Sequence, residues 1–83
     1  MMTRDDVLAL IRTHLAEELD IDPSRIEPGT RFREDLAADS LDLYTLVQEL
    51  EDTYHLTISD EQAARIQTVE AAVDFVLSNA ASR

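Results

Sequence analysis

The chain has 83 residues, with 18 acidic against 7 basic side chains, a formal net charge of −11 and no cysteine. This length predicts a single small domain over residues 1–83, and the missing cysteines exclude disulfides, zinc–thiolate centres and catalysis by a protein thiol. The charge argues against nucleic acid and anionic membranes as partners, because both are themselves negative. We therefore expect a soluble, cytoplasmic and monomeric acidic domain without a membrane-spanning segment, whose partners carry positive charge.

The first predicted helix spans residues 4–19, and Thr3 can cap its start. Apolar side chains recur along it at helical spacing, at Leu8, Ile11, Leu15 and Leu19, with Val7 beside them. Residues 20–38 contain both prolines and the only glycine, and they predict a long loop. Four apolar residues would hold this loop against the core: Ile21, Ile26, Phe32 and Leu36.

Residues 40–54 show the clearest helical pattern of the chain. Their apolar stripe consists of Leu43, Leu46, Val47, Leu50 and Tyr54. Ser59 and Gln62 predict a capping box that opens a short helix through Ile66. Thr68 would cap a last helix, whose apolar residues are Val69, Val73, Val76 and Leu77.

These segments predict an all-α fold, a small four-helix bundle with three main helices, one short helix and a long first loop. Apolar stretches that could form strands are too short to build a sheet. We expect an ordered core over about residues 3–77 and a frayed tail over residues 78–83.

Acidic residues dominate the middle of the chain, because residues 34–64 contain nine of them and no Arg or Lys. On the helix over residues 40–54, a partly apolar strip of Leu41, Tyr44 and Gln48 lies among acids and outside the core stripe. A solvated face is one interpretation. A docking surface is favoured, because the helix lacks i, i+4 pairs of opposite charge and exposes apolar residues ringed by one sign of charge.

Ser40 is the candidate functional residue, at the junction of the long loop and the acidic helix. As an alternative, Asp39 or Ser40 serves only as an ordinary helix cap, with Asp39 and Asp42 forming a capping arrangement. The functional interpretation has a physical basis, because a phosphate esterified to Ser40 would lie near free N–H groups and the positive end of the helix dipole.

Enzymatic chemistry is not expected from these residues. His14 and His55 have no reason to approach Ser40, and no glycine-rich turn offers an oxyanion hole. Asp20, Asp22 and the following serine imitate the start of a calcium loop, but a proline interrupts it and an arginine stands where the closing glutamate is needed. We therefore predict neither a catalytic residue nor a metal site.

Together, these residues resemble the acyl carrier protein family. The stretch from Phe32 to Asp42, with the sequence FREDLAADSLD, is similar to the family signature before and across its modified serine, and the similarity covers about residues 3–77. The resemblance implies that a phosphopantetheinyl transferase, using coenzyme A and magnesium, attaches 4′-phosphopantetheine to Ser40 and makes the chain a phosphoprotein. The thiol of this group would carry acyl chains as thioesters, which the bundle can shelter between its helices.

The resemblance also implies partners, namely acyl-chain synthases, reductases, dehydratases and transacylases with basic docking patches. The residues expected to dock them are Asp39, Leu41, Asp42, Tyr44, Glu49, Glu51 and Asp52. The favoured function is that of a stand-alone carrier in fatty acid biosynthesis. Alternatives are a carrier for a polyketide or dedicated lipid pathway and, in another class, an unmodified acidic interaction module. Peptidyl and aryl carriers fit the acidic helix less well.

Five positions depart from the common family pattern. Ala37 replaces a usual glycine, Thr45 a glutamate used in docking, Gln48 an apolar residue, Tyr44 a smaller valine and Ser59 a proline. None of these changes affects the chemistry of the serine. They point to a specialised set of partners.

Overall fold

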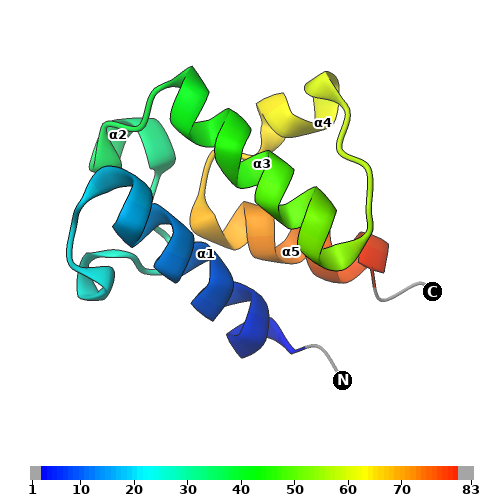
Figure 1. Ribbon diagram of the computed structural model, residues 1–83, viewed down its shortest axis with the longest axis horizontal. Helices are drawn as coiled ribbons and strands as arrows, with labels where there is room; N and C mark the ends of the chain where they lie inside the picture. Colours follow the sequence, from blue (N-terminus) through cyan, green and yellow to red (C-terminus); the bar gives the residue numbers. More distant parts are fainter. Residues whose placement is uncertain (1–2, 81–83) are drawn as a thin grey trace.

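The computed structural model describes residues 3–80, which form an all-α domain (Figure 1). The three long helices are α1 (Arg4–Leu19), α3 (Ser40–Tyr54) and α5 (Val69–Ala80), and the short ones are α2 (Phe32–Leu36) and α4 (Asp60–Arg65). A single 3-10 turn, η1 (Pro23–Arg25), lies in the loop after α1. Helix α1 packs against both α3 and α5. The predicted helical fold is confirmed.

Local capping residues set the starts of α1, α4 and α5, as the sequence predicts. The Thr3 side chain accepts a hydrogen bond from the backbone N–H of Asp6 at the start of α1. Ser59 and Gln62 form a reciprocal capping box at α4, and the Thr68 hydroxyl accepts from the backbone N–H of Ala71 at α5. Each cap satisfies N–H groups that an isolated helix end leaves without partners.

The core differs from the prediction in one detail of α1. Val7, expected beside the stripe, is fully buried with Ile11 and Leu15, whereas Leu8 and Leu19 are half-buried. Because α1 contacts two helices, its innermost line of side chains follows the i, i+4, i+8 row between them. The other fully buried large residues come from the loop, α2, α3 and α5: Ile26, Phe32, Leu46, Leu50, Val69, Val73 and Val76.

The segment predicted as a long loop contains one further short helix, α2. Its start is held by contacts distant in sequence: the N–H of Phe32 donates to the Gln67 carbonyl at 3.0 Å, and the N–H of Val69 donates to the Thr30 carbonyl at 3.0 Å. We call these bonds, together with the 2.7 Å bond from the N–H of Glu70 to the Pro28 carbonyl, the backbone tether. No local pattern announces such a start, since Arg31 at the N-cap gives α2 no side-chain cap.

Helix α5 extends to Ala80, beyond the end of the expected core, so residues 78–80 belong to a helix. Residues 81–83, the rest of the predicted frayed tail, lie outside the described residues. Over residues 3–80, no helix combines the length and the apolar character that crossing a bilayer requires.

Helix α2 ends at a backbone conformation that favours glycine. Ala37 has φ 56°, in the left-handed region, and this reversal turns the chain toward α3. A Cβ in that region costs about 1–2 kcal/mol relative to the right-handed conformation. The alanine that replaces the family's usual glycine is therefore a point of strain directly before Ser40.

We expect Ala37→Gly to stabilise the domain. Relief of the left-handed alanine outweighs the extra chain entropy of glycine, so the free energy of unfolding should rise by roughly 0.5 kcal/mol in urea titrations. Ala9→Gly, in the exposed middle of α1, is the control and should lower it by about 1 kcal/mol. A loss of stability in both variants would contradict strain at Ala37.

Candidate functional site

Ser40 is the first residue of α3, and its side chain is exposed. The cap of this helix is Asp39, whose carboxylate accepts from the backbone N–H of Asp42 at 2.9 Å, while Asp42 accepts from the N–H of Asp39 at 3.2 Å. The capping arrangement predicted from the sequence is confirmed. Because Asp39 and Asp42 complete it without Ser40, the serine hydroxyl is left over for another use.

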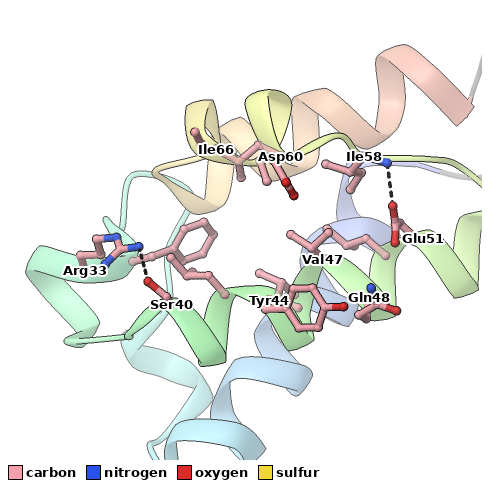
Figure 2. Close-up of a pocket in the computed structure, with 15 residues that line it drawn as sticks. Arg33, Ser40, Tyr44, Val47, Gln48, Glu51, Ile58, Asp60 and Ile66 are labelled. Atoms are coloured by element: carbon pink, nitrogen blue, oxygen red, sulfur yellow. Dashed lines mark hydrogen bonds between the residues drawn. The ribbon is translucent and has the colours of Figure 1, made fainter.

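Arg33 is the side chain that contacts this hydroxyl. Its Nη2 donates a hydrogen bond to Ser40 Oγ at 3.1 Å (Figure 2). This pair could not be predicted from the sequence, because the two residues lie seven apart across the break between α2 and α3 and match no local spacing. As Oγ accepts from Arg33, the hydrogen of the Ser40 hydroxyl stays available for donation to a base.

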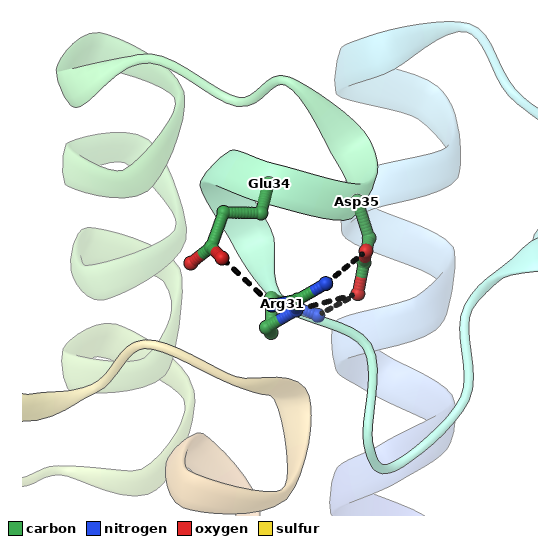
Figure 3. Close-up of polar contacts among 3 residues, drawn as sticks. All are labelled: Arg31, Glu34 and Asp35. Atoms are coloured by element: carbon green, nitrogen blue, oxygen red, sulfur yellow. Dashed lines mark hydrogen bonds and ion pairs between the residues drawn. The ribbon is translucent and has the colours of Figure 1, made fainter.

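An ion-pair cluster of Arg31, Glu34 and Asp35, which we call the Arg31 cluster, joins the residue before α2 to the helix that carries Arg33 (Figure 3). The guanidinium of Arg31 donates to both oxygens of Asp35, at 3.3 and 3.2 Å, and to Glu34 at 2.7 Å. The backbone N–H of Arg31 also donates to Asp35, at 2.8 Å. These hydrogen bonds from Arg31 hold the pKa of Asp35 below its usual value and raise the pKa of Arg31.

A pocket of about 540 Å³ opens between α3 and α4, and Ser40 and Arg33 stand at one end of it (Figure 2). Its apolar wall includes Leu43, Val47, Ile58 and Ile66. Polar side chains also line it, namely Tyr44, Gln48, Glu51 and Asp60. An apolar chain that starts at Ser40 therefore has an apolar cleft directly beside it.

The predicted docking residues of α3 include two large apolar side chains in solvent. Leu41 is 67% exposed and Tyr44 is 60% exposed, and they are the large hydrophobic residues that the described part of the chain leaves exposed. Asp39 and Asp52 are exposed as well. An apolar contact area with carboxylates at its edge is typical of a surface that binds a basic partner.

Three of the predicted docking carboxylates are half-buried and have structural contacts. Asp42 belongs to the α3 capping box, and Glu49 accepts from the Thr53 hydroxyl at 2.8 Å. Glu51 accepts from the backbone N–H of Ile58 at 2.7 Å, which ties the end of α3 to the segment before α4. Their charge still adds to the surface potential, but their positions are set by the fold.

Neither histidine lies at Ser40. His14 Nε2 is 3.5 Å from the hydroxyl oxygen of Thr45, a contact between α1 and α3. His55 caps the far end of α3, about 22 Å along the helix axis from Ser40 at 1.5 Å per residue. No imidazole is therefore placed to activate the serine as a nucleophile.

Comparison with known proteins identifies this arrangement. Residues 9–76 match the family model described as "Phosphopantetheine attachment site", a span that includes Ser40. The acyl carrier protein of Rubrobacter xylanophilus is 46% identical over 78 residues, which cover 94% of this chain and 96% of that protein. The acyl carrier protein of Thermosynechococcus vestitus is 35% identical over 81 residues, or 98% and 100% of the two chains.

A solved structure agrees with both relatives. The acyl carrier protein from Enterococcus faecalis, studied for its high thermal stability, superposes with a TM-score of 0.80 at 40% identity, covering 94% of this chain and 99% of that one. The chain therefore belongs to the acyl carrier protein family, whose members are non-catalytic carriers with covalently bound 4′-phosphopantetheine. The predicted family, cofactor and helical bundle are confirmed.

The Arg31 cluster makes a pH-dependent prediction for the substitution Asp35→Asn. Since the pKa of Asp35 is lower in the folded than in the unfolded chain, its stabilising effect is complete above the unfolded value and disappears as the pH falls through the folded one. The variant should therefore lower the free energy of unfolding at neutral pH, modestly because the pair is exposed, and its effect should shrink as the pH falls below the pKa of an ordinary aspartate, about 4.

Urea titrations from neutral to acidic pH measure this difference. Asp52→Asn is the matched control, because it removes an exposed carboxylate from a chain of net charge −11 and should leave stability unchanged or raise it. An equal loss of stability in Asp35→Asn at both ends of the pH range would contradict the assigned ion pair.

Proposed function

We propose that Ser40 is the attachment residue for 4′-phosphopantetheine and that the chain carries acyl intermediates of fatty acid biosynthesis. One observation carries this assignment: the Ser40 hydroxyl is exposed at the start of α3, is not used in capping, and stands at the end of the α3–α4 pocket. The group supplies a thiol that holds acyl chains as thioesters, which a chain without cysteine lacks.

Attachment requires a phosphopantetheinyl transferase, with magnesium and coenzyme A as donor. In this reaction Ser40 Oγ forms a bond to the phosphorus next to pantetheine, the bond from that phosphorus to the oxygen bridging to the adenosine moiety breaks, and adenosine 3′,5′-bisphosphate leaves. The proton of the hydroxyl goes to a base of the transferase. The exposed position of Ser40 and its free hydrogen support this role as a substrate.

The pocket offers shelter for the cargo. Its apolar wall would remove hydrocarbon from water, which is worth roughly 25 cal/mol per Å² of apolar surface. The polar residues Tyr44 and Gln48 line the same pocket and favour a second candidate, a carrier for oxygen-bearing chains of a polyketide or specialised lipid pathway. In either case the protein supplies the binding and orientation, and its partner enzymes perform the reactions.

The outer face of α3 is the proposed docking surface for these enzymes. Leu41 and Tyr44 give apolar contact, and Asp39 and Asp52 attract the basic patches of synthases, reductases, dehydratases and transacylases. Asp42, Glu49 and Glu51 contribute negative potential from fixed positions. A cytoplasmic, monomeric protein is the form in which we expect it to act.

Intact mass after incubation with coenzyme A, magnesium and a promiscuous transferase tests the attachment. We expect one added phosphopantetheine on the wild-type chain, none on Ser40→Ala and one on Ser59→Ala, a control at the exposed cap of α4. An unchanged wild-type mass would refute the carrier function and favour the unmodified interaction module.

Stopped-flow association with a purified acyl-chain synthase tests the docking surface. Asp52→Lys should lower the association rate about threefold to tenfold and flatten its salt dependence, because it removes steering charge. Leu41→Ala removes an apolar contact, so it should raise the dissociation rate and weaken the binding free energy by about 1 kcal/mol or more. Glu27→Lys changes the same charge in the loop before α2 and should have a smaller effect; equal effects of both Lys variants would contradict docking at α3.

A further inference from the structure

Arg33 differs from Arg4 and Arg31, the two arginines that form ion pairs within residues 3–80. Arg4 pairs with Asp74, and Arg31 pairs with Glu34 and Asp35, but no ion pair within residues 3–80 involves Arg33. Its one hydrogen bond there goes to the neutral oxygen of Ser40. A guanidinium has five N–H donors in a planar fork, so Arg33 has donors left for an anion at this position.

Ser40 lies among acidic side chains, where a cation lowers the electrostatic repulsion. Asp39 and Asp42 flank the serine, and no Arg or Lys follows until Arg65. A phosphodiester on Ser40 would add one more negative charge to this acidic corner. The N–H groups at the start of α3 offset part of that repulsion, and Arg33 is the cationic side chain in contact with the serine.

We infer that Arg33 is a phosphate-binding and positioning residue, which binds the phosphodiester of the prosthetic group and orients it. The inference rests on Ser40 as the attachment residue. Esterification would keep Oγ as a bridging oxygen, 3.1 Å from Arg33 Nη2 in the unmodified chain, and the two non-bridging phosphate oxygens would lie two bonds from Oγ, within reach of the same guanidinium. The guanidinium fork matches a pair of phosphate oxygens better than any other side chain does.

Binding of the phosphate by Arg33 would also affect where the attached acyl chain lies. Arg33 and Ser40 both line the α3–α4 pocket and stand at the same end of it (Figure 2). Arg33 would hold the phosphate on the α2 side and restrict its rotation about the Ser40 side chain, so the rest of the group would begin beside the pocket. The backbone tether and the Arg31 cluster hold α2, and through it Arg33, in this orientation.

NMR of the apo and phosphopantetheinylated proteins tests the inference without any enzymatic assay of the carrier. The Arg33 Nε–H signal should shift when apo protein is converted to the modified form. The Nε–H signal of Arg25, exposed in η1, is the internal control and should stay in place. The phosphorus-31 signal of the modified protein should shift in Arg33→Gln and return toward the wild-type position in Arg33→Lys.

Salt provides a further control, because screening should reduce the phosphorus-31 difference between wild type and Arg33→Gln. Arg25→Gln should leave that signal unchanged. An Arg33 Nε–H signal that is the same in both forms, with a phosphorus-31 signal insensitive to Arg33→Gln, would overturn the inference. If Arg33→Gln fails to fold, the comparison within the wild-type protein decides.

Intact mass separates this inference from the proposed function. A chain that gains no group on Ser40 overturns both. A chain that gains the group but shows no response at Arg33 overturns only the role of the arginine.

Discussion

The backbone tether is the constraint on which the rest of the site depends. It joins residues 28–32 to residues 67–70 and so anchors the long connection between α1 and α2 to the start of α5. Helix α2 is too short to be stable alone, since helices gain stability cooperatively with length. The tether and the Arg31 cluster supply the stability that so short a helix lacks. Arg33 and Ser40 meet because α2 is held there.

The molecule has an uncharged core, which stabilises the fold, and a negatively charged surface, which is available to partners. The fully buried side chains are apolar, and no buried side-chain polar atom among the described residues lacks a hydrogen-bond partner. The negative charge therefore lies at the surface, where it raises self-repulsion and favours partners of positive charge. On α3 the acids surround Leu41 and Tyr44, two apolar residues whose exposure serves no purpose in folding.

Most of the fold follows from local sequence signals, and the exceptions are interactions between distant residues. Thr3, Asp39 and Ser59 cap their helices within three residues of the N–H groups they accept from, so the pattern alone identifies them. Helix α2, the burial of Val7 and the bond from Ile58 to Glu51 depend on packing between elements, which no spacing reveals. At the candidate site, Ser40 could be proposed from its place at a helix start, but its contact with Arg33 joins residues of two different helices and could not be predicted.

The division of labour between Asp39 and Ser40 has a consequence for how the carrier is recognised. Since Asp39 and Asp42 close the start of α3 between them, the proposed esterification of Ser40 would leave every bond of the capping box intact. The cap of α3 would then be the same in the bare and the loaded molecule, so a partner enzyme could not distinguish the two by this cap. The enzymes of successive reactions would therefore have to recognise the attached group itself at the start of α3. The acidic face of α3 would be bound by all of them alike.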